Sequence, residues 1–509
     1  MSEAPAHSVR RRVAIGATFM ILLRFAFRAI GLVNTYILVR ILVPSDFGLV
    51  GLATLAYSVF DTLSQLSFQL AIIRMESPKR VHYDTAWTMG VLRGAVIAAL
   101  IIATAPLLAD FVGEPRVVQL SYVLAALGLV SGFENVALVD FQRNLQFDRI
   151  FWYQVLAKLA GVLIAIPAAY ILRNYWALVL GIAASRLASL MLGYLMKPYR
   201  PRMSLAGWQD LFGFSKWLMI TNVLSVIDNY CMTLTAGRVA GTPAIGIYQI
   251  AYEIGALPAS EVAAPIRDPI YAGYSSIADD LIMLRKHFLS NLAILIMIIT
   301  PMSLGISLMA EPLTHLFLGQ KWIAAIPLIR LTALFALFEA IGHSASSIYM
   351  TLHRQGRFVA LAAIIVSIRV PAIIVGALVA GVYGATVAMT FTGLLNMVLW
   401  NACVPAELNV KARDFLSISW RTVLAGLVMS ASVLVLLKSW PSSSDTIAII
   451  VRGLAICAAG ACVSIATQIG LWCLSSFPAS AEAEALHVVR ALTERAIGDM
   501  RRASRSFGA

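Results

Sequence analysis

The chain has 509 residues, of which 60% are hydrophobic and 13% charged, with a formal net charge of +13 and a mean hydropathy of +0.82. This balance excludes a soluble globular protein, because about 20 mostly apolar residues suffice to span a bilayer and the sequence offers many such stretches. The five cysteines have no metal-type spacing, so the sequence predicts neither a metal site nor disulfides.

The predicted elements are all helices that cross the membrane. They begin near residues 13, 47, 84, 117, 150, 175, 211, 243, 284, 323, 358, 383, 416 and 447. The first follows the basic stretch "SVRRR", but its apolar part exceeds signal-peptide length and has no small-residue cleavage site, so we expect a retained helix. The predicted fold class is an all-α integral membrane protein of about 14 transmembrane helices.

The placement of lysine and arginine predicts the topology, because cytoplasmic loops are enriched in both. With the N-terminus inside, the external loops hold only Arg40, Arg116, Arg173, Arg238, Lys321 and Lys438. The positive charge is therefore a topology signal, and no nucleic acid partner is expected. We predict a multi-pass protein with both termini in the cytoplasm.

An internal repeat divides the chain. "RILVPSDFG" (40–48) and "RVAGTPAIG" (238–246) both place an arginine eight residues before a glycine, with a proline between them. Arg143 and Phe147 match Arg354 and Phe358 in the second half of the chain. Two interpretations remain open, namely two parallel six-helix repeats or a chance similarity of loops. The predicted divisions are a tail (1–12), an N-lobe (13–200), a C-lobe (201–405), two extra helices (406–475) and a cytoplasmic tail (476–509), for which an amphipathic helix and an unstructured segment are both open.

Four helices carry a polar stripe on one face, and they are the first two helices of each half. Polar faces in lipid must turn toward protein or a hydrated cavity, so we predict a central cavity between the halves. The stripes contain Arg24, Arg28 and Thr35; Thr54, Tyr57, Asp61 and Gln65; Asn222, Ser225 and Asp228; and Gln249, Glu253 and Ser260.

Two arginines lie deep in the first helix, where each costs about 2.5–3.5 kcal/mol on insertion scales. Arg24 and Arg28 are four residues apart and therefore share one helical face. Either they form ion pairs with Asp61 or Asp228, or their planar groups bind a phosphate or pyrophosphate. Among the other cations, Lys158, Lys216 and Arg421 are close enough to the cytoplasmic ends of their helices to snorkel to the headgroups. For the deep residues Arg93, Arg186 and Arg369, pairing with Glu134, Glu339 or backbone carbonyls is favoured over a direct ligand role.

The chain has no phosphate-binding glycine loop and no metal motif, so no cofactor is predicted. Its external loops are short, which disfavours a membrane glycosyltransferase or polymerase. These features favour a secondary transporter or a flippase over an enzyme.

"VRILVPSDFGLVGLA" (39–53) resembles the R-x-L-x-P-x-x-F-G signature of bacterial lipopolysaccharide and exopolysaccharide exporters, a branch of the multidrug/oligosaccharidyl-lipid/polysaccharide flippase superfamily. "QRNLQF" (142–147) and "FLGQKW" (317–322) resemble two further stretches in the same order, and the resemblance covers roughly residues 10–440. Ser45 stands where an acidic residue is frequent in the family.

The resemblance implies two six-helix lobes around a central cavity, and export of an undecaprenyl-pyrophosphate-linked oligosaccharide across the bacterial inner membrane. Its implied partners are that lipid-linked substrate, membrane lipids, and the polysaccharide polymerase and chain-length machinery. It makes Arg24, Arg28 and Lys216 the candidates for the pyrophosphate, with Asp61, Asp228 and Glu253 also in the cavity. It gives the motif residues Arg40, Pro44, Phe47 and Gly48 a structural role.

Two alternatives remain open from the sequence. A multidrug or cation antiporter of the same architecture would use Asp61 or Asp228 as its coupling or drug-binding group, but two deep arginines would repel a cationic drug. A membrane polysaccharide polymerase lacks catalytic groups in these short external loops.

Overall fold

A computed structural model describes residues 4–64, 71–73, 75, 77–208, 216–404, 408–440 and 446–475. All regular elements in these ranges are helices, as predicted. They form two compact units, one of residues 1–249 with 377–382 and the other of residues 250–376 with 383–509. The predicted lobe boundaries at residues 200 and 405 remain a prediction.

The first unit contains α1 (Ala4–Ile41), α2 (Pro44–Leu63), α4 (Arg80–Val112), α5 (Arg116–Gly132), α6 (Val139–Arg143), α7 (Phe147–Leu172), α8 (Trp176–Met196) and most of α10 (Lys216–Gly255). The second contains α11 (Ala264–Ser275), α12 (Leu281–Leu308), α13 (Ala310–Leu313), α14 (Ala325–His343), α15 (Ser346–Thr351), most of α16 (Gln355–Cys403), α18 (Ala412–Ser439) and α19 (Thr446–Leu474).

Within the described ranges, nine helices are long and apolar enough to cross a membrane, or ten if a bent pair (116–143) counts as one span. The number fourteen therefore remains a prediction. Two helices contain a break at a glycine with positive φ: Gly241 in α10 (φ 74°) and Gly381 in α16 (φ 59°). Because 49 residues of α16 would extend about 74 Å, more than twice the hydrocarbon core, this break divides the helix into two segments of spanning length.

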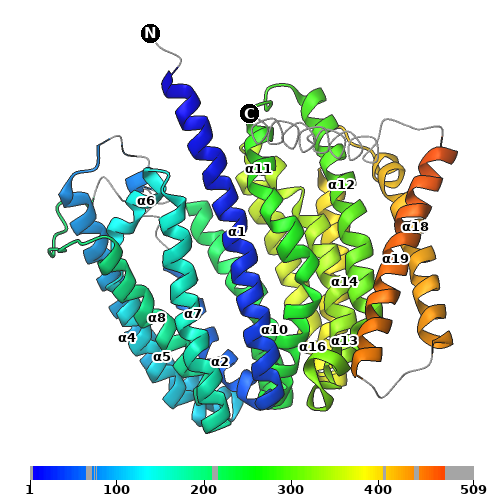
Figure 1. Ribbon diagram of the computed structural model, residues 1–509. Coiled ribbons are helices and arrows are strands. Elements are labelled where there is room, and N and C mark those ends of the chain that lie inside the picture. The colour runs from blue at the N-terminus through cyan, green and yellow to red at the C-terminus, as the bar shows by residue number, and fades with distance from the viewer. Residues whose placement is uncertain are drawn as a thin grey trace, which may run out of the picture. The chain divides into compact units, whose positions relative to one another are not determined.

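Small residues let neighbouring helices of the first unit pack closely (Figure 1). A Cβ atom on Gly132 of α5 would lie 2.8 Å from the carbonyl oxygen of Gly90 in α4. A Cβ atom on Gly161 of α7 would lie 2.8 Å from the carbonyl oxygen of Gly181 in α8. Such approach of backbones is the usual way in which transmembrane helices associate, because lipid offers no hydrophobic driving force between them.

The two segments of the predicted repeat contact each other within the first unit. A Cβ atom on Gly48 of α2 would lie 1.8 Å from the carbonyl oxygen of Thr242 in α10. A Cβ atom on Gly246 would lie 1.9 Å from the carbonyl oxygen of Pro44. Under the repeat offset of 198 residues, Gly48 corresponds to Gly246 and Pro44 corresponds to Thr242. Each glycine therefore contacts the residue that is equivalent to the other glycine's partner, so the contact is reciprocal. Equivalent positions of the two segments therefore contact each other.

The segment that follows α8 is fixed to the start of α4. Asp84, which is buried, accepts hydrogen bonds from the Tyr199 hydroxyl and from the backbone N–H of Arg202. The hydroxyls of Thr85 and Thr88 accept from the backbone N–H groups of residues 207 and 204. Burial, followed by the hydrogen bond to Asp84, raises the pKa of the Tyr199 hydroxyl.

Candidate functional site

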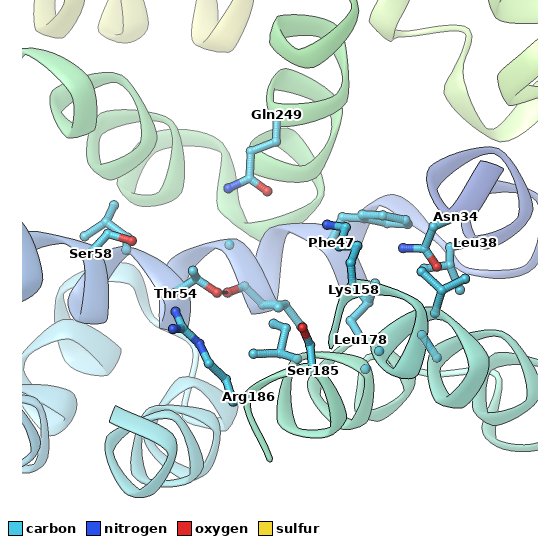
Figure 2. A pocket seen from close by; sticks show the side chains of 18 of the residues that line it. Asn34, Leu38, Phe47, Thr54, Ser58, Lys158, Leu178, Ser185, Arg186 and Gln249 are labelled. Atoms are coloured by element: carbon cyan, nitrogen blue, oxygen red, sulfur yellow. Dashed lines mark hydrogen bonds between the residues drawn. The ribbon is translucent and has the colours of Figure 1, made fainter. Parts of the chain in front are cut away.

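An open cavity of about 650 Å³ lies in the first unit and is lined by residues of α1, α2, α7, α8 and α10. Figure 2 shows Gln249 reaching from α10 and Arg186 from α8 into the same space beside α2. The lining residues with polar side chains are Asn34, Thr54, Ser58, Lys158, Ser185, Arg186, Tyr230, Thr233 and Gln249. The lining therefore combines two cations with hydroxyl and amide groups, and it contains no carboxylate among the described residues.

The close packing of α7 and α8 sets the two cavity cations at one level. A Cβ atom on Gly161 would meet Gly181 and Ser185, and one on Gly181 would meet Ala165 and Gly161. Gly161 thus lies opposite residue 183, the middle of the helical turn 181–185 of α8, which runs antiparallel to α7. Lys158 is three residues before Gly161, and Arg186 is three residues after residue 183. The two cations therefore lie at the same level along the hairpin. Both side chains enter the cavity from one helical hairpin.

The two cations have weak partners. The Lys158 ammonium nitrogen lies 5.9 Å from the centre of the Phe27 ring of α1. The Arg186 guanidinium carbon lies 5.6 Å from the centre of the Tyr57 ring, and its Nη1 atom is 3.9 Å from Oε1 of Glu134. A separation of 3.9 Å is too long for a hydrogen bond, so the ion pair is loose.

The predicted pyrophosphate ligands lie beside this cavity. Arg24 is exposed and Arg28 half-buried on α1, whereas Phe27, Asn34 and Leu38 of the same helix line the cavity. At about 100° per residue, the two arginines lie about 60–100° around the helix from that lining face. They remain candidate ligands on an adjacent face.

The predicted acidic residues do not line the cavity. Asp61 pairs with Arg93, whose Nη2 atom is 2.7 Å from its Oδ1 atom. Asp228 of α10 is half-buried, and Glu253 is exposed in the second unit. The side chain of Lys216 lies outside the described residues.

The family motif residues hold the start of α2. Pro44 is the first residue of α2, and the Asp46 carboxylate accepts from the backbone N–H of Val43 at 3.2 Å, closing the helix N-terminus. Arg40 lies over the Tyr36 ring, Phe47 lines the cavity and Gly48 makes the reciprocal contact with α10. This geometry agrees with the structural role that the resemblance implies.

The structure confirms two predicted ion pairs and corrects two predictions. Arg186 faces Glu134. Arg369 bonds to Glu339, and only 3% of the Arg369 side chain is exposed. The Glu339 carboxylate also accepts a hydrogen bond from Asn396 at 2.9 Å. Arg421 does not snorkel, because it is buried in α18 with 5% exposure.

Lys158 does not snorkel either, because the packing of α7 on α8 turns it into the cavity. Sequence reasoning therefore missed Lys158 and Arg186 as cavity residues. The available signal was the small-residue spacing beside each of them, Gly161 with Ala165 and Gly181 with Ser185, which marks the packed face of each helix.

A bundle of long apolar helices around a polar cavity within the membrane defines the class of multi-pass membrane transport proteins. The chain belongs to the family described as "Polysaccharide biosynthesis protein", whose profile matches residues 37–327. It is 24% identical over 439 residues to "Lipopolysaccharide biosynthesis protein WzxC" of Escherichia coli, covering 85% of this chain and 89% of that protein. It is 23% identical to "Succinoglycan biosynthesis transport protein ExoT" of Rhizobium meliloti, covering 59% and 62% of the two chains.

Solved structures share the fold. The chain matches "Lipid II flippase MurJ, inward closed conformation" with a TM-score of 0.70, 14% identity, and coverage of 90% of this chain and 99% of that one. It matches an inward-facing multidrug resistance transporter of the MATE family with a TM-score of 0.57, 16% identity, and coverage of 75% and 94%. The predicted fold class and the resemblance to polysaccharide exporters are thereby confirmed.

Proposed function

We propose that this protein is a flippase that moves an undecaprenyl-pyrophosphate-linked oligosaccharide from the inner to the outer leaflet of the bacterial inner membrane. The proposal is supported by membership of the polysaccharide biosynthesis family and by relatives named for lipopolysaccharide biosynthesis and succinoglycan transport. A solved structure of the same fold is a lipid II flippase. The reaction moves the substrate without breaking a covalent bond, so the protein is a transporter and not an enzyme.

The observation that carries the proposal is the charge of the cavity. Its described lining holds Lys158 and Arg186 and no carboxylate, so an anionic head group is attracted and a cationic drug is repelled. Arg24 and Arg28, on the adjacent face of α1, add two cations to the same side of the helix. A pyrophosphate carries the charge that such a surface binds.

The predicted ligands have assigned roles in this proposal. Arg24 and Arg28 contact the pyrophosphate, with Lys216 as a further cation, while Asp61, Asp228 and Glu253 are further candidate substrate-binding residues. The partners are the lipid-linked oligosaccharide, membrane lipids, the polymerase and the chain-length machinery, and both termini are cytoplasmic.

The second candidate, a multidrug or cation antiporter, has one supporting observation, the likeness to a MATE transporter. Such a protein needs an acidic group where its cationic substrate binds. In this chain Asp61, the first candidate for that role, already bonds to Arg93.

The two functions are separated by one pair of measurements. Proteoliposomes containing the purified protein should translocate a fluorescent undecaprenyl-pyrophosphate oligosaccharide, and a deletion strain should accumulate that lipid on its cytoplasmic face. Ethidium efflux by the same proteoliposomes, without lipid translocation, would overturn the flippase in favour of the antiporter. Flipped but unpolymerised lipid in the deletion strain would instead indicate a polymerase.

A further inference from the structure

Lys158 lies near the middle of a membrane-spanning helix. It is the twelfth residue of α7, about 16 Å along a helix of 26 residues. A cation at this depth is costly in lipid, so it is found where it is paired, where it lines a polar space, or where it binds a ligand. The helix position therefore requires a reason for the charge.

Two other deep cations of the described chain have carboxylate partners. Arg93 pairs with Asp61 at 2.7 Å, and Arg369 bonds to Glu339. For Lys158, no described carboxylate oxygen lies within 4.0 Å, and its recorded neighbour is the face of the Phe27 ring. A ring face attracts a cation more weakly than an anion does, so the ammonium group is available to a ligand.

Arg186 is available because its ion pair is loose. Its side chain is 41% exposed and its nearest carboxylate, that of Glu134, is 38% exposed and 3.9 Å away. The register of the hairpin places it level with Lys158, and both line one cavity. An anion that enters this space therefore meets a point charge from α7 and a planar fork from α8.

We infer that Lys158 and Arg186 form an anion-binding subsite within the first unit, distinct from the Arg24 and Arg28 face of α1. The inference rests on the proposed function and assigns the subsite to an acidic group of the lipid-linked oligosaccharide, either its diphosphate or a sugar carboxylate. Both present anionic oxygens that pair with ammonium and guanidinium groups. The cavity, at about 650 Å³, falls in the range of pockets that enclose a ligand of sugar-phosphate size.

The hydroxyl and amide groups of the cavity suit the remainder of such a ligand. Thr54 and Ser58 of α2 and Gln249 of α10 lie around the same space as the two cations (Figure 2). Hydroxyl and amide groups both donate and accept hydrogen bonds, as sugar hydroxyls require. A cationic end and a hydroxyl-rich wall in one cavity match an acidic group that is attached to a sugar.

The test is equilibrium binding to the purified protein in nanodiscs, measured by calorimetry with inorganic pyrophosphate and, separately, glucuronate. Wild type should bind at least one of these anions, and Lys158→Gln and Arg186→Gln should each weaken that binding at least tenfold. Lys158→Arg should recover part of it. Preference for pyrophosphate assigns the diphosphate to the subsite, and preference for glucuronate assigns a sugar acid.

Two controls make the result specific. Lys438→Gln removes an exposed cation at the end of α18 and should bind as wild type. Arg173→Gln removes an exposed cation just after α7, outside the cavity lining, and should likewise bind as wild type. Folding of each variant is checked by its elution as a single species and by its unfolding midpoint.

Three outcomes would overturn the subsite. They are wild-type affinity in folded Lys158→Gln, wild-type affinity in folded Arg186→Gln, and absence of binding in wild type at millimolar anion. Lipid translocation by wild-type proteoliposomes together with any of these leaves the flippase intact and removes only the subsite. Anion binding without lipid translocation does the reverse.

Discussion

Replacing Gly48 with alanine tests the reciprocal contact between α2 and α10. The added Cβ atom would lie 1.8 Å from the carbonyl oxygen of Thr242 and 3.0 Å from the backbone nitrogen of Gly246. Ordinary contact begins at 3.4 Å, so the shortfall at the oxygen is about 1.6 Å. The obstacle is backbone, which no rotamer change can move aside. The two helices must therefore separate.

The expected cost follows from two opposing terms. Overpacking in a well-packed interior costs about 1–3 kcal/mol, whereas glycine to alanine within a helix gains up to about 1 kcal/mol. Because the clash involves backbone on the opposite helix, we expect the first term to win and Gly48→Ala to destabilise the protein. Gly246→Ala should do the same, since its Cβ atom would lie 1.9 Å from the carbonyl oxygen of Pro44.

The matched control is Gly31→Ala, also in a membrane-spanning helix. A Cβ atom there would meet nothing within 4 Å, so this variant should be neutral or slightly more stable. The unfolding midpoint of the three variants in one detergent is the measurement, with polysaccharide export as a second readout. The double variant of Gly48 and Gly246 should lose less than the two single losses together, because helices already separated accept both Cβ atoms. Equal midpoints for Gly48→Ala and Gly31→Ala would refute the reciprocal contact.

Three further predictions concern charges. Arg24→Ala with Arg28→Ala should leave the protein level near normal and abolish export. Lysine at both sites should restore export only in part, because an ammonium group lacks the bidentate fork. Full export by the double alanine variant would exclude these two residues as ligands. Asp84→Ala should lower stability by about 1–3 kcal/mol, measured by unfolding, because it removes a buried carboxylate that accepts from the half-buried Tyr199 hydroxyl and from a backbone N–H. The hydrogen bond from Arg116, and then its charge, lowers the pKa of Glu114 below 4.5. The ionised Glu114 carboxylate therefore stabilises the folded protein above pH 4.5, and this stabilisation is lost as the pH falls further. The difference in unfolding midpoint between wild type and Glu114→Gln should shrink in that lower pH range.

The helical class could be predicted from the sequence because apolar length alone decides which segments enter a bilayer. The junctions near residues 243 and 383 could be predicted as well, since each follows a glycine that takes a positive φ in the structure. The spacing of arginine, proline and glycine likewise indicated the repeat, whereas the contact between its two segments comes from the structure. These are local signals, and one residue or one stretch carries each of them.

The partners of the cations depend on how each helix is rotated about its axis, which a span of apolar residues does not encode. One of the two interpretations of Arg24 and Arg28 paired them with Asp61 or Asp228. Asp61 instead bonds to Arg93 from α4, a helix whose rotation is set by its glycine contacts with α5. From the predicted helix start near residue 150, Lys158 was placed within reach of the headgroups, whereas the contact of Gly161 with α8 turns it into the cavity. The same small residues that bring α7 and α8 together therefore place the two cavity cations level with each other. A larger residue at Gly161 or Gly181 would push the helices apart and move those cations, so in this protein the packing of the hairpin and the charge of the cavity are not independent properties.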